Sequence, residues 1–395
     1  MHNHPPVIEL PEIEAEAVYH QHAYGAVLAV DRLYDVHAGQ FPVFYTRYLG
    51  KIYCSTSCLH LADATNHFAF NPFCRWVMRQ SMVHVIWYPF FHTYFKGIYR
   101  IKPFTEVTIR GTHSIAEYRP AFFHFERDVN AFIRLTAEKM IECVHHYEDR
   151  YPNHKHIVAV GGMDARFILA VPKKKPQNWI VYSLPPDASS VREFVKVNKM
   201  PYECWFPEWP PVHPETEAEY LYKMLITQCL TDPVHFREAP VLAPYLKPNE
   251  KYLFWTGDLG DCLTTVQPEY QRYNSLLFYS GLSSRGTAYQ GFSSLYMLGA
   301  LGIPYVPFYH YPPLWKEVFL KFSPSIIQYD TRHDILSELD KQLNQKTISV
   351  KGPGTPAPTP RLPFRREEVM VRAARLVEEK KNQGIINPLN NAYPR

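Results

Sequence analysis

A short apolar run followed by two glycines constrains the middle of this chain more than any other feature. Residues 156–160 read His-Ile-Val-Ala-Val, and Gly161-Gly162-Met163-Asp164-Ala165-Arg166 follows directly. An apolar run of this length is typical of a buried strand, and the residues from Asp164 onward are typical of a helix start. The stretch therefore predicts a strand, a tight turn large enough for a phosphate group, and a helix.

The turn itself has two interpretations. Glycines allow backbone N–H groups to come close to an anion, and a helix N-terminus adds partial positive charge. The sequence has neither the Gly-Lys-Ser/Thr ending of a Walker A loop nor a Gly-x-Gly-x-x-Gly pattern at this place. Taken alone, the turn is explained as well by an ordinary strand-to-helix connection with Asp164 as the helix cap.

A second turn of the same kind favours a ligand site. Leu253-Phe-Trp-Thr256 is another apolar run, and Gly257-Asp-Leu-Gly-Asp261 follows it. The C-terminal ends of parallel strands share one edge of a sheet, where ligands bind. Asp164 and Asp261 would then hold Mg²⁺ against phosphates, which requires only one or two carboxylates. Two acidic loops on a solvated edge are the alternative.

At these two turns the chain resembles a known family. Val160-Gly-Gly-Met-Asp-Ala165 is similar to the Ser-Gly-Gly-x-Asp-Ser pyrophosphate loop of the asparagine synthetase family of ATP pyrophosphatases. Thr256-Gly-Asp-Leu-Gly-Asp261 resembles the second motif of that family, Ser/Thr-Gly-(Glu/His)-Gly-(Ala/Gly)-Asp. Gly302-Ile-Pro-Tyr-Val-Pro-Phe-Tyr-His310 lies near the place of its Pro-Phe-Leu-Asp segment. The likeness covers about residues 126–345, and residues 20–110 vaguely resemble the amidotransferase half of the family.

The resemblance implies an enzyme that uses Mg-ATP to convert a carboxylate to its adenylate, releases pyrophosphate and forms an amide with an amine. The implied substrates are a small-molecule or peptide carboxylate and an amine. Asp164 and Asp261 would be the Mg²⁺ ligands, and Asp258 would join them as a catalytic carboxylate. The implied ATP-binding residues are Val158, Val160, Gly161, Gly162, Met163, Asp164, Arg166, Thr256 and Gly257.

Three departures from the family pattern bear on activity. Val160 and Ala165 stand where the family has its two loop serines, and a hydrogen bond to a charged group is worth about 1.5–3 kcal/mol. His2 stands where the amidotransferase half has a cysteine, so the amine must come free, from a partner protein or from within the substrate. Lys346 and Lys351 are candidates for a late catalytic lysine by position only. A nucleotide-binding or scaffold relative without catalysis is therefore the alternative function.

The periodicity of the chain predicts an α/β protein in two parts. Residues 1–125 contain short alternating runs separated by turn residues, which predict a β-rich antiparallel domain that resembles a degenerate amidotransferase. Residues 126–350 begin with an apolar spacing that predicts an amphipathic helix over 128–149. Helices then alternate with apolar strands, which predicts a parallel sheet with helices on both faces. The resemblance narrows this second part to an adenine nucleotide alpha-hydrolase-like fold. Residues 351–395 read as a proline-rich linker, a charged helix over 367–381 and a tail.

Charge and cysteine content narrow the cellular setting. The net charge is +4, and residues 351–395 carry nine Lys/Arg and four Glu, or +5, so residues 1–350 carry −1. A nearly neutral body does not predict a nucleic-acid partner. The seven cysteines are scattered and odd in number, which favours reduced thiols in the cytoplasm. The apolar windows 82–91 and 295–308 are too short and interrupted to predict a membrane span, and no secretory pattern is present, so we expect a soluble protein.

Two other groups of residues have simpler interpretations. Cys54-x₃-Cys58-x-His60 superficially suggests zinc, but the spacing is loose and structural thiols in a strand are favoured. Lys173–Lys175 most simply solvates the end of a helix.

Overall fold

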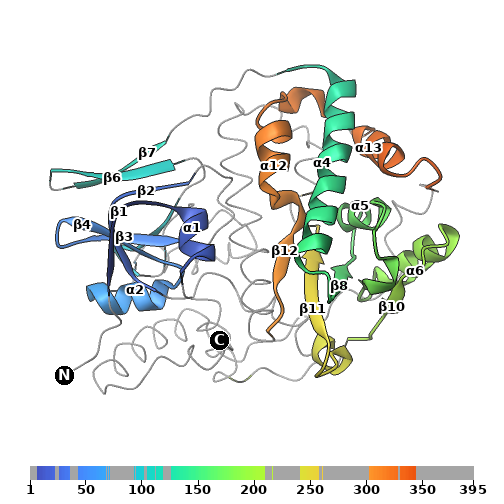
Figure 1. The fold of residues 1–395 in the computed structure, drawn as a ribbon, viewed down its shortest axis with the longest axis horizontal. Coiled ribbons are helices and arrows are strands. Elements are labelled where there is room, and N and C mark those ends of the chain that lie inside the picture. The colour runs from blue at the N-terminus through green and yellow to red at the C-terminus, as the bar shows by residue number, and fades with distance from the viewer. Residues whose placement is uncertain are drawn as a thin grey trace.

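Two β-sheets organise the chain in this computed structural model, and they lie in separate parts of the molecule (Figure 1). The strands of the first sheet precede residue 119, and those of the second follow residue 153. A β-rich part therefore precedes an α/β part, while the domain boundary at residues 125 and 126 stays a prediction. The structure describes residues 7–22, 26–35, 43–67, 69, 71, 93, 95–101, 105–111, 113–118, 126–209, 216, 241–257, 260, 302–327 and 330–343.

The first sheet has seven strands. They are β1 (Ile8–Glu14), β2 (Leu28–Tyr34), β3 (Phe44–Tyr48), β4 (Lys51–Ser55), β5 (Tyr99–Arg100), β6 (Thr105–Arg110) and β7 (His113–Tyr118), with helices α1 (Ala15–His20) and α2 (Cys58–Thr65) between them. β3 and β4 form the predicted hairpin, whose turn holds Leu49 and Gly50 at positive φ. β1 runs parallel to β2, whereas the other registered pairs of this sheet are antiparallel, so the predicted antiparallel sheet is corrected to a mixed one. Parallel neighbours need a crossover connection, and α1 lies in this one.

Two cysteines of the first part, Cys54 and Cys58, lie in its described elements. Cys54 lies in β4, but Cys58 is the first residue of α2, which corrects its predicted place in a strand. Ser57 caps that helix by accepting a hydrogen bond from His60 N at 3.2 Å. Both residues are buried and neither forms a disulfide, and burial raises the pKa of the Cys54 thiol to about 12. Within the described ranges, no three His, Cys, Asp or Glu residues are grouped so as to hold a metal ion.

The second sheet has five parallel strands in the order β10-β9-β8-β11-β12. Their bounds are β8 (His154–Ala159), β9 (Trp179–Tyr182), β10 (Glu203–Trp205), β11 (Lys251–Thr256) and β12 (Tyr305–Pro307). The chain leaves β8, passes through α5 (Asp164–Ala170) to β9, and passes through α6 (Ala188–Val197) to β10. β11 and β12 then lie on the opposite side of β8. The predicted parallel sheet is confirmed, and β8 is its central strand.

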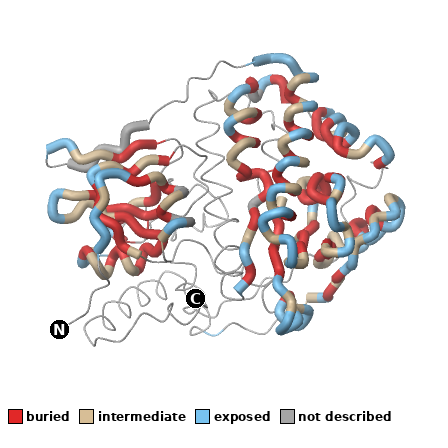
Figure 2. Tube along the Cα trace, viewed as in Figure 1, coloured by how far each residue is buried: buried red, intermediate tan, exposed pale blue. Residues whose placement is uncertain are grey.

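Side chains of the second sheet alternate between two buried faces. Figure 2 shows buried residues along the backbone of this sheet and of the helices beside it. Val158 and Trp255 belong to one hydrophobic cluster, and Ile157 and Phe254 belong to another. The first cluster also contains residues of α4, α5, α6, α12, η8 and α13. In the described part of the chain these helices all pack on that face, so helical cover of the second face stays a prediction. The remaining bounds are α4 (Val129–Arg150), η2 (Pro176–Asn178), η4 (Ala243–Tyr245), η7 (Phe308–His310), α12 (Pro312–Leu314), η8 (Trp315–Phe319), η9 (Pro324–Ile326) and α13 (Thr331–Leu339).

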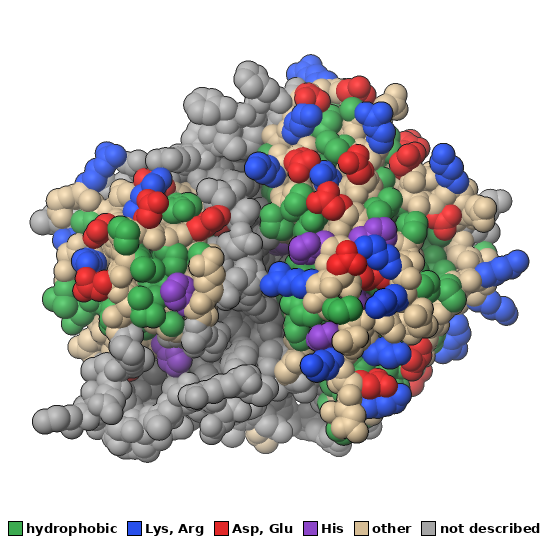
Figure 3. Space-filling model, viewed as in Figure 1, with side chains coloured by type: hydrophobic (Ala, Val, Ile, Leu, Met, Phe, Trp, Pro, Cys, Tyr) green, Lys and Arg blue, Asp and Glu red, His purple; other side chains and the backbone are tan. Residues whose placement is uncertain are grey.

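Helix α4 matches the helix predicted over residues 128–149. Asp128 caps it, because the Asp128 carboxylate accepts a hydrogen bond from Ala131 N at 3.0 Å. Lys139 pairs with Glu142 and Glu317, at 2.7 and 2.9 Å, and so ties α4 to η8. Figure 3 shows acidic and basic side chains intermixed over these helices. None of the helices in the described ranges combines the length and apolar character that a membrane span requires.

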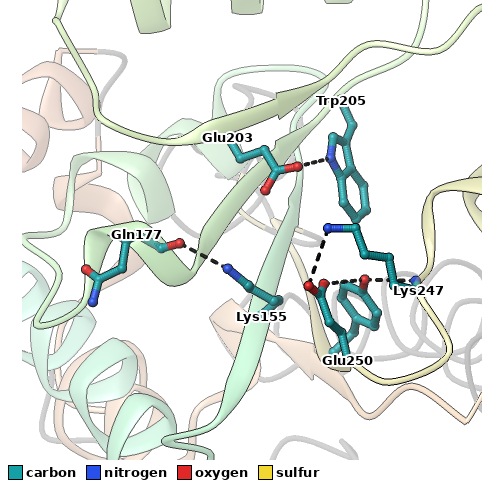
Figure 4. A network of polar contacts seen from close by, with 7 residues as sticks. Lys155, Gln177, Glu203, Trp205, Lys247 and Glu250 are labelled. Atoms are coloured by element: carbon teal, nitrogen blue, oxygen red, sulfur yellow. Dashed lines mark hydrogen bonds and ion pairs between the residues drawn. The ribbon is translucent and has the colours of Figure 1, made fainter.

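Polar contacts tie together the amino ends of the parallel strands, a region that we call the amino edge (Figure 4). It comprises Glu148, Lys155, Gln177, Glu203, Lys247, Glu250 and their partners. Lys155 Nζ donates to Gln177 O at 3.4 Å, and Glu250 accepts from the Tyr252 hydroxyl at 2.7 Å. Glu203 accepts from the indole N–H of Trp205 at 2.8 Å. Most polar side chains at this edge thus have a hydrogen-bond partner in a neighbouring side chain or in the backbone.

Glu148 is the most deeply buried carboxylate of the amino edge, at 4% exposure. Its carboxylate accepts three hydrogen bonds, from Trp179 Nε1 at 2.9 Å, Lys174 N at 3.1 Å and Lys175 N at 3.2 Å. A buried carboxylate is tolerated when donors replace the water that it loses. Glu148 therefore joins the end of α4 to the start of β9.

Candidate functional site

The order in which the chain adds strands to the parallel sheet reverses at the central strand β8. β9 and β10 lie on one side of it, and β11 and β12 lie on the other. Open α/β sheets bind ligands outside the carboxyl ends of the strands at such a switch point. Gly161 and Gly162 follow β8, and Gly257 follows β11. We call the segments 160–164, 183–187, 256–260 and 308–310, which follow β8, β9, β11 and β12, the carboxyl edge.

The two glycine turns contact each other directly. A Cβ atom on Gly257 would lie 2.5 Å from Ala165 N and 2.7 Å from Asp164 C. A Cβ atom on Gly260 would lie 2.5 Å from Asp164 Cβ. A side chain at either position would collide with the first turn, so this approach requires glycine. The predicted meeting of the two turns at one edge is confirmed.

The glycines of the first turn have space beside them, whereas those of the second turn are packed against other residues. A Cβ atom on Gly162 would meet no heavy atom within 4 Å, and one on Gly161 would lie 3.4 Å from Asp187 Oδ2. Space above a glycine is where a ligand approaches the backbone most closely. The residues at 161 and 162 thus present the accessible part of the carboxyl edge.

Asp164 is held by an ion pair and does not act as a helix cap. The residue before α5 is Met163, and α5 has no side-chain cap, so the predicted capping role of Asp164 is wrong. Asp164 Oδ1 accepts from Arg332 Nη2 at 2.8 Å, and Arg332 Nη1 lies 3.4 Å from Met163 Sδ. The side chains of Arg332 and Asp164 are 11% and 23% exposed, which leaves the carboxylate partly open to solvent. The Tyr309 hydroxyl donates to Asp164 O at 3.1 Å.

Three other predicted nucleotide contacts lie inside the protein. The side chains of Val158 and Val160 are buried in the hydrophobic cluster under α5. Arg166 is buried as well, donates to Ser190 Oγ at 3.1 Å and lies 5.4 Å from the centre of the Phe194 ring. Its guanidinium group therefore points toward α6. Its predicted role in ATP binding is not supported by this placement.

The remaining predicted residues divide into two groups. Thr256 ends β11 at the edge, where its hydroxyl lies 2.9 Å from the Tyr305 hydroxyl. Asp258, Asp261, Lys346 and Lys351 lie outside the described residues, so their predicted roles stay predictions.

Ser183 and Asp187 belong to the site but were not predicted from the sequence. Ser183 follows β9, is 2% exposed, and its hydroxyl has no hydrogen-bond partner in the described part of the chain. Asp187 brings a carboxylate next to Gly161. The loop from β9 to α6 carries both, and only its position beside β8 makes it relevant. Arg332 was missed for a similar reason, since 168 residues separate it from Asp164.

His310 adds a buried imidazole to the same edge. It ends η7, directly after Tyr309, and is 2% exposed. Burial lowers its pKa to about 3, and the positive charge of Arg100 acts in the same direction. Neither ring nitrogen has a hydrogen-bond partner among the described residues. The imidazole is therefore neutral at physiological pH.

Together these groups surround the open glycine turn with charged side chains, including the carboxylates of Asp164 and Asp187. The glycine turn gives access to the backbone, and Arg332 places a guanidinium group beside it. Comparison with protein-family models gives no matching family, and comparison with curated proteins gives no match.

Proposed function

We propose that the carboxyl edge binds ATP, with its phosphates over Gly161 and Gly162. We further propose that the protein is an ATP-dependent ligase that adenylates a carboxylate, releases pyrophosphate and forms an amide with an amine supplied from outside. The observation that carries the proposal is the contact between the two glycine turns at the switch point of a parallel sheet. An adenine nucleotide alpha-hydrolase-like fold, preceded by an amidotransferase-like part, is the finer fold proposed with it.

The described residues fit the phosphates of a nucleotide. Gly162 leaves the turn open, and the Arg332 guanidinium group lies beside it. Ser183 offers a buried hydroxyl without a partner in the described ranges. Arginine and backbone N–H groups are common phosphate ligands in proteins. Catalysis in such a site rests on positioning the phosphates and on stabilising the charge of the departing pyrophosphate.

Asp164 and Asp261 are the proposed Mg²⁺ ligands. Asp164 fits this role through its partly exposed carboxylate, of which Oδ1 is engaged by Arg332. When bound, Mg²⁺ neutralises negative charge on the phosphates. In the protein itself, Asp164 fixes Arg332 over the turn, and Tyr309 holds the Asp164 backbone in place. Asp258 is proposed as a further catalytic carboxylate.

The Asp164–Arg332 ion pair also favours a second candidate function. An arginine that already neutralises the loop carboxylate competes with a metal ion for it. Val160 and Ala165, moreover, bring no hydroxyl groups to the loop. A nucleotide-binding scaffold without ligase activity is therefore the alternative, and it shares the same site.

Turnover and binding measurements separate the two functions. Purified protein is incubated with Mg-ATP, a pool of carboxylates and a pool of amines, and AMP and pyrophosphate are measured. We expect both products, and we expect Asp164→Ala and Asp261→Ala to reduce them strongly. Asp334→Ala, an exposed residue of α13, is the matched control. ATP binding without products would favour the scaffold, whereas the absence of ATP binding would refute the site.

A further inference from the structure

The hydroxyl of Ser183 is a buried polar group that the fold does not use. The residue is 2% exposed, and its Oγ atom has no hydrogen-bond partner among the described residues. Its backbone N–H is engaged, donating to Trp205 O at 3.1 Å. A buried hydroxyl without a partner costs about 1–3 kcal/mol, so such groups require an explanation. Alanine at this place would avoid that cost.

The register of the parallel sheet places Ser183 beside the open glycine turn. Ala159 of β8 is the registered partner of Tyr182 of β9, and Val160 N donates to Tyr182 O at 2.8 Å. One residue further along both strands, Ser183 lies next to Val160, at the spacing of about 4.8 Å that separates neighbouring strands. Gly161 and Gly162 follow immediately.

Ser183 also lies on the same face of the sheet as the turn. Val181, two residues earlier, belongs to the hydrophobic cluster that contains Val158 and Val160. Side chains two positions apart in a strand point to the same side. The Ser183 hydroxyl is thus on the face where the chain turns from β8 into α5.

We propose that Ser183 is a phosphate ligand, and that its hydroxyl donates a hydrogen bond to a phosphate oxygen of the nucleotide bound over Gly161 and Gly162. This inference rests on the proposed ATP site. Binding would give a partner to a hydroxyl that has none among the described residues. The same group therefore lowers stability in the absence of ligand and raises affinity for it.

Binding measurements with three ligands test the role of Ser183. ATP, inorganic pyrophosphate and adenosine are titrated into wild-type protein and Ser183→Ala by calorimetry. A hydrogen bond to a charged group is worth about 1.5–3 kcal/mol, so we expect the affinity for ATP and pyrophosphate to fall about 10- to 150-fold. Adenosine, which has no phosphate, should bind both proteins equally. Ser337→Ala, an exposed serine of α13, is the control.

Two further measurements separate a ligand contact from a structural role. Ligand-free Ser183→Ala should unfold at the same temperature as wild type or at a higher one. The double variant Ser183→Ala with Val160→Ser, which moves a hydroxyl to the registered neighbour, should recover part of the lost ATP affinity.

Each other outcome overturns the proposal in a distinguishable way. Equal ATP affinity in wild type and Ser183→Ala would refute the role of Ser183 and leave the ATP site standing. A loss confined to adenosine would assign the hydroxyl to the nucleoside instead of the phosphates. A large fall in unfolding temperature without ligand would make Ser183 structural. Failure of the wild type to bind ATP and pyrophosphate would refute the proposed function and this inference together.

Discussion

The two edges of the parallel sheet differ in how most of their buried polar groups are paired. At the amino edge, Glu148 accepts three hydrogen bonds, and Glu203 and Glu250 each accept one from a neighbouring aromatic side chain. At the carboxyl edge, Ser183 and His310 are buried without hydrogen-bond partners in the described part of the chain. Glycines stand at the carboxyl edge, where side chains would fill the space or collide.

The difference separates residues that hold the fold from residues that can serve a ligand. Satisfied buried groups contribute to stability, whereas unsatisfied ones reduce it and are retained for another reason. Substitutions at the amino edge should therefore change stability and leave ligand binding intact. Substitutions at the open part of the carboxyl edge should weaken ligand binding and leave stability unchanged.

The largest effect is expected from Glu148→Ala at the amino edge. The substitution leaves the buried Trp179 indole without an acceptor and removes the acceptor of two part-buried backbone N–H groups, so we expect a loss of about 3–5 kcal/mol in the free energy of unfolding. Urea titration measures this loss. Glu138→Ala, on an exposed position of the same helix, is the control and should change stability by about 0.5 kcal/mol or less. Equal small losses in both variants would show that Glu148 does not join α4 to the sheet.

Acid should destabilise the protein through two buried imidazoles. His156 has a hydrogen-bond partner, and His310 has none among the described residues. His156 accepts from Trp255 Nε1 at 3.2 Å, and burial lowers its pKa from 6.5 to about 4, with Glu148 opposing part of the shift. The unfolded chain takes up a proton near pH 6.5, but folded His156 does so only near pH 4. Stability is therefore lost as the pH falls between these values. We expect His156 alone to cost about 2 kcal/mol at pH 5.

Two variants resolve this pH dependence in urea titrations at pH 7 and pH 5. His156→Met and His310→Met should each lose less stability than wild type over this range. At pH 7, His156→Met should be the less stable, because it leaves the Trp255 indole without its acceptor, whereas His310→Met removes no hydrogen bond within the described residues. Equal stability of the two variants at pH 7 would contradict the distinction between buried groups that have a hydrogen-bond partner and those that do not.

A pair of glycine substitutions gives the smallest change in stability and the sharpest contrast within the carboxyl edge. Gly257→Ala forces a Cβ atom against the backbone of Asp164 and Ala165, and we expect a loss of about 1–3 kcal/mol. Gly162→Ala meets open space, so stability should stay within about 0.5 kcal/mol while ATP affinity falls. Thermal unfolding and ATP titration of both variants check this. Unchanged ATP affinity in Gly162→Ala would place the phosphates elsewhere.

The sequence predicted the parts of this architecture that depend on local pattern. The apolar runs ending at Val160 and Thr256, with the glycines after them, predicted strands β8 and β11 and the meeting of their turns. The helix over 128–149 followed from its apolar spacing and matches α4. The glycine turns were informative because they reveal where two segments of backbone must approach closely.

Long-range partners were beyond the reach of local pattern. Nothing in the residues around Asp164 shows that Arg332 would pair with it and displace the predicted helix cap. Ser183 looks like any serine after a strand, and only the register against β8 gives it meaning. The parallel pairing of β1 with β2 was missed because alternation in a strand does not specify the direction of its neighbour.

That parallel strand has a consequence for how the chain behaves when it is shortened. β1 covers one side of β2, whose Leu28 and Val30 are fully buried. Charged residues line β1, where Glu9 pairs with Lys51 and Glu12 with Arg32, and Pro11 offers no N–H to a further strand. Such features keep an outer strand from recruiting copies of itself. A truncation that removes β1 would expose an apolar strand edge, and the shortened protein should aggregate.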